Sequence, residues 1–143
     1  MFREIVTFIC NQTGFTLGTN LFAGHMPQDK PDRCVMVGES GGGEPNFDCP
    51  DMANLNIQVL TRGMTYFNAR DDAHTVFDAL TNRGSAIPSS GWNIARIDGS
   101  GEDYLAMTIE AISTPAYIGP DSNGRHLFST NYIFRMEEAS CGL

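Results

Sequence analysis

The sequence has no apolar run long enough to cross a membrane, and it carries little positive charge. A membrane-spanning helix needs about 18 consecutive apolar residues, and no stretch of the 143 residues approaches this length. Lys30 is the only lysine, and 17 acidic against 9 basic residues give a net charge of −8. Binding to phosphate backbones depends on an excess of cations, so direct nucleic-acid recognition is not expected. Glu4 interrupts the apolar N-terminus and no basic leader precedes it, so we expect no signal peptide.

Closely spaced cysteine and histidine pairs are also missing. The four cysteines stand far apart, at Cys10, Cys34, Cys49 and Cys141. Without a C-x-x-C pair, neither a zinc site nor a redox site is expected. Free buried thiols are the favoured state, and a disulfide is left open. His25, His74 and His126 are isolated in the sequence, so we expect no metal and no cofactor.

Length and composition favour one globular domain over residues 1–143, with 41% apolar and 18% charged residues. Apolar residues at helical spacing predict a helix from Met1 to Asn11 and a second one from Tyr66 to Thr81. Thr65 is a candidate cap for the second helix, and Gly84 would follow its end.

Alternating or continuous apolar runs predict six strands. They are Leu21–Ala23, Arg33–Glu39, Leu55–Val59, Trp92–Ile97, Leu105–Ile112 and Arg125–Met136. This order lacks regular β-α-β alternation. It predicts an α+β fold, a mostly antiparallel sheet with two main helices packed on one face. The other face would be exposed to solvent or would bind partners. Its candidate residues are Thr108, Glu110, Ser129, Thr130 and Asn131.

The connecting segments are rich in glycine and proline. We expect loops at Met26–Asp32, Ser40–Pro45, Asp98–Gly101 and Gly119–Gly124. The three consecutive glycines of the second loop argue against regular structure there, and Pro115 would end or bend a strand. Four aromatic residues could anchor an interface, although core packing is the favoured reading. They are Phe47, Trp92, Tyr117 and Phe128.

The segment Gly38–Gly42 matches G-x-S-x-G, the nucleophile elbow of serine hydrolases. Ser40 would then be the nucleophile, with Asp98 and His126 as the acid and base. No helix can begin soon after Ser40, because two glycines and then Glu44 and Pro45 follow it. A loop is therefore favoured over a catalytic site, and a small serine hydrolase is a remote alternative. No lysine follows the glycines, which excludes a P-loop.

Three consecutive segments carry a family resemblance. Arg33–Pro45 reads RCVMVGESGGGEP, Leu55–Gly63 reads LNIQVLTRG, and Tyr66–Asp71 reads YFNARD. Together they resemble the bacteriophage minor capsid proteins that include the tail terminator, or tail completion, proteins. The resemblance covers most of the chain and is weakest after Gly119.

The resemblance implies a structural protein with no catalytic residues. Its subunits would form a homohexameric ring in the neck region of the virion, assembled in the host cytoplasm. The ring would end polymerisation of the tail tube protein and dock to the head-tail connector or stopper protein. Phage DNA would pass through the lumen without specific binding. Another neck component, a head-tail adaptor or stopper, is the alternative.

Two segments are expected to reach neighbouring subunits or the tube. This interface hypothesis names Glu39, Ser40, Gly41, Gly42, Gly43, Glu44 and Pro45, together with Gly119, Pro120 and Asp121.

Overall fold

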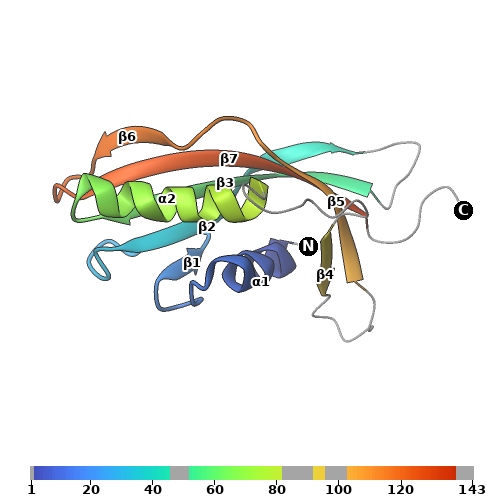
Figure 1. Ribbon diagram of the computed structural model, residues 1–143, viewed down its shortest axis with the longest axis horizontal. Helices are drawn as coiled ribbons and strands as arrows, with labels where there is room; N and C mark the ends of the chain where they lie inside the picture. Colours follow the sequence, from blue (N-terminus) through green and yellow to red (C-terminus); the bar gives the residue numbers. More distant parts are fainter. Residues whose placement is uncertain (1, 46–51, 82–91, 96–102, 138–143) are drawn as a thin grey trace, which may run out of the picture.

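A computed structural model of the protein describes residues 2–45, 52–81, 92–95 and 103–137 (Figure 1). These residues form two helices and a seven-stranded sheet. The helices are α1 (Phe2–Thr13) and α2 (Tyr66–Thr81). The strands are β1 (Leu21–Ala23), β2 (Cys34–Pro45), β3 (Met52–Gly63), β4 (Trp92–Ala95), β5 (Asp103–Ala111), β6 (Ala116–Pro120) and β7 (His126–Glu137).

The sheet has the strand order β1-β2-β3-β7-β5-β4, and β6 also pairs with β7. The β1–β2 pair is parallel, and the other described pairs are antiparallel. This confirms the predicted α+β class with a mostly antiparallel sheet. Figure 1 shows the long strands β3 and β7 running side by side through the centre of a twisted sheet.

Strands β5 and β6 lie end to end along one edge of β7. Ala111 pairs with Tyr132, and Ala116 pairs with Ser129. Four residues of this edge, Ile112–Pro115, therefore lie between these two pairs, where β7 has only two, Thr130 and Asn131. Pro115 lies in this interruption, between the end of β5 and the start of β6. The continuation into β6 was not predicted.

Both helices begin and end close to the predicted residues. The α1 helix runs two residues past Asn11, to Thr13, and Gly14 follows it with a positive φ of 83°. At the start of α2 the Thr65 hydroxyl accepts a hydrogen bond from the Asn68 amide at 3.1 Å. Thr65 is therefore the N-cap, as predicted.

The core lies between the two helices and one face of the sheet. The α2 helix contacts β3, β5 and β7, and α1 contacts α2 and β4. The largest fully buried side chains come from both helices and from four strands. They include Ile5, Ile9, Val76, Leu21, Val35, Val37, Ile57, Val59, Tyr132, Phe134 and Met136.

On the other face of the sheet, several of the described side chains are partly or fully exposed to solvent. Ser129 and Asn131 are half-exposed there, and Glu110 is exposed. The prediction that Thr130 lies on this face was wrong. Successive side chains of a strand point to opposite faces, so Thr130, between Ser129 and Asn131, points to the helix side and is buried. Met36 is half-exposed on the outer face, so β2 is fully covered on one side only.

The glycine-rich segment Ser40–Pro45 is not a loop, which corrects the prediction. Strand β2 continues through it and pairs with β3 as far as Pro45 opposite Ala53. The pairing register shifts twice, between Glu39 and Gly42 and between Gly42 and Pro45. Such β-bulges place extra residues in one strand. Gly41 has a φ of 130°, which glycine adopts without steric cost.

The predicted Gly119–Gly124 turn is shorter than expected. Gly119 and Pro120 end β6, and the turn begins at Asp121, whose amide donates to the Arg125 carbonyl at 2.8 Å. The predicted turn Asp98–Gly101 lies outside the described residues. No helix among those described is both long and apolar enough to cross a membrane.

Candidate interaction surface

Strand β6 forms an edge of the sheet at the end where α2 begins. One side of β6 pairs with β7. Its other side pairs with no strand in the described ranges, and Figure 1 shows no helix or strand beyond it. Unpaired backbone groups of an edge strand can accept another strand. Tyr117 and Ile118 of this strand are 42% and 54% exposed.

An aromatic cluster connects this edge to the start of α2. The Tyr66 ring lies in the middle, with its centroid 5.1 Å from those of both Tyr117 and Phe128 and 5.6 Å from that of Phe67. The Tyr117 hydroxyl is 2.9 Å from Nδ1 of His126. Phe128 is buried beneath the cluster. Tilted and edge-on contacts of this kind are favourable for aromatic rings, so they stabilise the positions of the exposed rings in the cluster.

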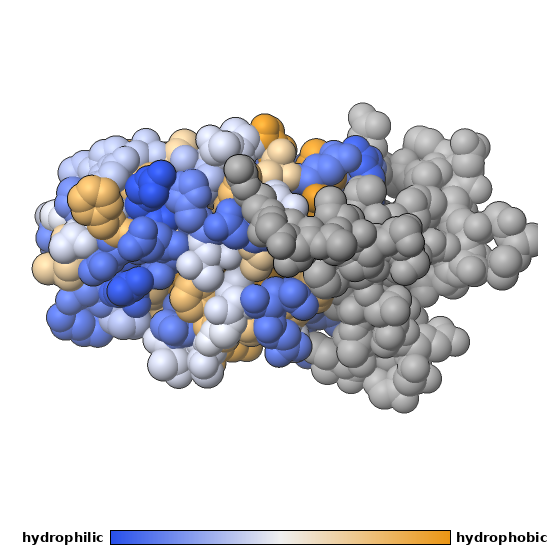
Figure 2. All heavy atoms as spheres, in the orientation of Figure 1, coloured by the Kyte–Doolittle hydropathy of each residue, from blue (hydrophilic) through white to orange (hydrophobic). Residues whose placement is uncertain are grey.

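We use the name aromatic patch for the exposed aromatic residues of this cluster: Tyr66, Phe67 and Tyr117. Phe67 is the most exposed of the three, at 69%. Figure 2 shows apolar side chains at the end of the molecule where α2 begins, among largely hydrophilic neighbours. Contiguous exposed apolar groups on a soluble domain mark interaction sites.

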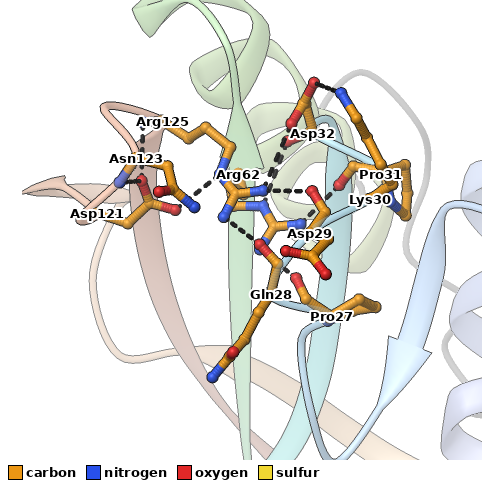
Figure 3. A network of polar contacts seen from close by, with 10 residues as sticks. All are labelled: Pro27, Gln28, Asp29, Lys30, Pro31, Asp32, Arg62, Asp121, Asn123 and Arg125. Carbon is orange, nitrogen blue, oxygen red and sulfur yellow. Dashed lines mark hydrogen bonds and ion pairs between the residues drawn. The ribbon is translucent and has the colours of Figure 1, made fainter.

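The same end of the molecule is held together by two buried arginines (Figure 3). Arg62, at the end of β3, is 3% exposed. Its guanidinium group donates to the carbonyls of Pro27, Pro31 and Asp32, with the Pro31 contact at 2.6 Å. Backbone carbonyls of an irregular loop need such partners when they are buried. Arg62 therefore fixes the loop that leads into β2.

Arg125, at the start of β7, is 4% exposed and holds the same loop to the β6–β7 turn. It donates to the carbonyls of Gln28 and Asp29 and, at 2.8 Å, to the Asp121 carboxylate. Burial pushes the pKa of Asp121 upward. The amide hydrogen bonds from Arg125 and Asn123, with the Arg125 guanidinium, outweigh burial and hold that pKa below its ordinary value.

A second open edge lies on the opposite side of the sheet. Strand β1 pairs only with residues Val35–Val37 of β2. Beyond Val37, no described strand pairs with the outer side of β2. Glu39 and Ser40 are exposed on this stretch.

A family model described as bacteriophage tail terminator protein matches residues 8–138. This chain belongs to that family. A comparison with the curated proteins gives no match. Family membership confirms the predicted resemblance. It makes the chain a structural protein of the bacteriophage tail.

The hydrolase arrangement is not formed in this tail terminator. Ser40 lies within β2 and not on a strand-to-helix turn. Glu39 pairs with Ile57, whereas His126 pairs with Gly63, six residues further along β3. At roughly 3.4 Å per residue, about 20 Å of strand separates the two positions. Asp98 lies outside the described residues.

The two segments of the interface hypothesis lie at different ends of the tail terminator. Glu39–Pro45 belongs to the β2 edge, whereas Gly119 and Pro120 belong to the β6 edge. Asp121 has a structural role, as the carboxylate partner of Arg125. Whether either segment contacts a neighbour stays a prediction.

The described residues also decide several smaller predictions. Cys10 and Cys34 are free thiols, and burial raises the pKa of both. Cys49, Cys141 and Phe47 lie outside the described residues, and the Trp92 side chain is not described. The two remaining aromatic candidates differ: Tyr117 is exposed, whereas Phe128 belongs to the core.

The exposure of Phe67 was not predicted from the sequence. Two adjacent aromatic residues at a helix start were the available signal. Neighbouring positions of a helix point about 100° apart, so both rings cannot enter the same core.

Proposed function

We propose that this tail terminator forms a closed homohexameric ring at the head-proximal end of the tail. The ring would stop addition of tail tube subunits and dock to the head-tail connector or stopper protein. The supporting observation is the pair of open edges, β6 on one side of the sheet and the later part of β2 on the other. A ring requires two different surfaces that meet head to tail and close, and we assign these two edges to that role.

Charge supports a passage for DNA through such a ring. The net charge is −8, and most described cations are engaged within the subunit. Ion pairs join Lys30 to Asp32, Arg33 to Asp72 and Arg135 to Glu110, and the two buried arginines hold loop carbonyls. Few of the cations in the described residues therefore stay available to attract phosphates, so DNA would slide without binding.

The position of Ser40 supports a function without catalysis. A serine-directed covalent probe added to the folded protein should leave Ser40 unlabelled, because no base lies beside it in the described residues. Stoichiometric labelling at Ser40 would revive the hydrolase and contradict this part of the proposal.

Tail length tests the proposed function directly. Tails assembled without the protein should be longer than normal and variable in length, and adding the purified protein should restore one length. Unattached tails of normal length would instead indicate a head-side adaptor or stopper. Electron microscopy of the purified protein, alone and on tail tubes, should show rings with six subunits and an open centre.

A further inference from the structure

Each side of the sheet consists of two strands that take turns as the edge. On one side β5 and β6 follow each other along β7, and on the other side β1 covers only the first part of β2. The pairing registers give the level of each stretch along β3. Strand β6 lies level with Leu60–Gly63, and β1 lies level with Val59–Thr61. The open end of β5, Ile109–Ala111, and the open part of β2, Glu39–Gly42, both lie level with Leu55–Ile57.

These levels restrict how two copies can join. A closed ring keeps every copy of a residue at one height along the ring axis, so about an axis along the strands only level stretches can meet. The open end of β5 then faces the open part of β2 in the next subunit. Strand β2 is antiparallel to β3, β3 to β7 and β7 to β5. Strands β2 and β5 therefore run in opposite directions and meet as antiparallel partners.

The backbone of the open part of β2 has hydrogen-bonding groups directed outward. Residues of a strand direct these groups alternately to one side and the other. The Val35 amide donates outward to the Asn20 carbonyl at 2.9 Å, and the Val37 carbonyl accepts from the Gly24 amide at 2.8 Å. Glu39 follows in the same alternation. Its N–H and C=O therefore point away from β3, where no described strand pairs with them.

The open end of β5 offers matching groups at the same level. The Ile112 amide, just after β5, donates to the Asn131 carbonyl of β7 at 2.9 Å. By the same alternation the groups of Ala111 point away from β7. Strand β4 pairs with β5 only as far as Ala106 and leaves Ala111 open among the described residues. Ala111 and Glu39 of the next subunit both lie level with Ile57, so their donors and acceptors face each other.

An exposed apolar residue lies beside this stretch. Ile112 is 62% exposed, and its partner Asn131 lies level with Gly38 of β2. Gly38 has no side chain, and the Met36 sulfur lies 3.2 Å from the place of a β-carbon there. Met36 is itself half-exposed. Ile112 can therefore bury its side chain against Met36 of the next subunit.

Apolar residues also match at the level of the aromatic patch. Leu17 is 54% exposed and forms a bridge with Leu21 of β1, which lies level with Tyr117 of β6. The outward groups of Leu21 already bond to Thr16 and Gly18. Side chains rather than strand pairing therefore make this part of the contact.

From these observations we propose that ring subunits are related by rotation about an axis along the strands and join through level edges. Glu39–Gly42 of one subunit pairs as an antiparallel strand with Ile109–Ala111 of a second copy of this chain. Leu17 of the first subunit packs against Tyr117 of the same copy. The contact is heterologous, so each subunit presents one side of its sheet to each neighbour. This inference rests on the proposed ring and assigns its subunit contact.

Proline substitution tests the strand pairing. Ala111→Pro removes an N–H that points away from the subunit's own sheet, and edge strands tolerate proline on that side. The variant should therefore stay folded in urea unfolding. The concentration needed for assembly, measured by light scattering alone and with purified tail tubes, should rise by about tenfold or more. Ala111→Ser keeps the N–H and should assemble like the wild type.

Disulfide cross-linking tests the level of the contact and decides alone should Ala111→Pro not fold. Ser40 and Glu110 both lie level with Asn56, but within one subunit roughly 14 Å of sheet separates them, too far for a disulfide. The variant that combines Ser40→Cys with Glu110→Cys should oxidise to covalent dimers and larger species on a non-reducing gel. Each single variant controls for the native cysteines. Ser40→Cys with Tyr117→Cys places the thiols about 17 Å apart along the strands and should give no such species.

The outcomes that would overturn the inference are distinguishable. Wild-type rings, together with no cross-link between the Ser40 and Glu110 positions or with a folded Ala111→Pro variant that assembles normally, would exclude this contact and leave the proposed function intact. A cross-link between the Ser40 and Tyr117 positions would exclude the level arrangement. A wild type that stays monomeric both alone and on tail tubes would overturn the proposed ring, and this contact with it.

Discussion

Gly63 lies so close to the first turn of α2 that a β-carbon built on it would come within 2.8 Å of the backbone nitrogen of Ala69. Strand β3 ends at Gly63 and α2 begins three residues later, at Tyr66. The helix therefore folds back directly over the end of the strand. Neither backbone can move without disturbing the other, so only glycine fits at this position.

Replacement of Gly63 by alanine should destabilise the protein by about 1–3 kcal/mol, the usual cost of forcing an added methyl group into a packed site. Urea unfolding followed by circular dichroism measures this change. Gly38→Ala is the matched control, because its β-carbon would meet only the flexible Met36 side chain. Equal effects of the two substitutions would contradict the tight contact.

Replacement of Arg62 by methionine should lower the free energy of unfolding by roughly 3 kcal/mol or more. The carbonyls of Pro27, Pro31 and Asp32 lose their donor, and an unsatisfied buried group costs about 1–3 kcal/mol. Arg70→Met, on the exposed surface of α2, should change stability by no more than about 0.5 kcal/mol. A small effect of Arg62→Met would show that water can replace the guanidinium group.

Acid should remove the stabilisation that Asp121 provides. Its folded-state pKa lies below the ordinary value of 3.8, so its contribution is fully present above the unfolded pKa and is lost as pH falls through the folded one. The difference in unfolding free energy between the wild type and Asp121→Asn should stay constant from about pH 8 to pH 5 and shrink below about pH 4. The exposed Asp71→Asn control should show little difference at any pH. A constant difference between wild type and Asp121→Asn down to pH 2 would contradict the assignment.

Replacement of Gly41 by alanine should strain the bulged part of β2. The φ of 130° is one that side chains rarely adopt, even though a β-carbon would meet nothing within 4 Å. A cost of about 1–3 kcal/mol is expected from backbone conformation alone. Ser40→Ala, at the neighbouring exposed position, should be nearly neutral. If both variants unfold at the same urea concentration, the positive φ is not required.

Local patterns were enough to predict the main elements. The apolar stripe of Tyr66–Thr81 and its Thr65 cap specify α2, and the alternation in Leu55–Val59 specifies which side chains of β3 face inward. These signals work because helical and strand periodicities differ. They failed at Ser40–Pro45, where local propensity disfavours a strand and pairing with β3 overrides it.

The interaction surface was less accessible to sequence reasoning. The glycine-rich segment and Gly119–Asp121 were noticed as chain features, but their place on two opposite edges depends on the strand order. Arg62 and Arg125 gave no signal, since a buried arginine is recognised only by the carbonyls that surround it. Tyr66 and Tyr117 come together through the register of β6 on β7.

By itself, the sequence determined the fold class, the two helices, the acidic charge and the family, because each depends on composition or on short-range order along the chain. Only the tertiary structure decided which edges of the sheet stay open, which aromatic rings share one surface and which arginines are buried. Those properties arise from contacts between residues far apart in the chain, and the free energy of such contacts depends on burial and pairing that no local pattern encodes.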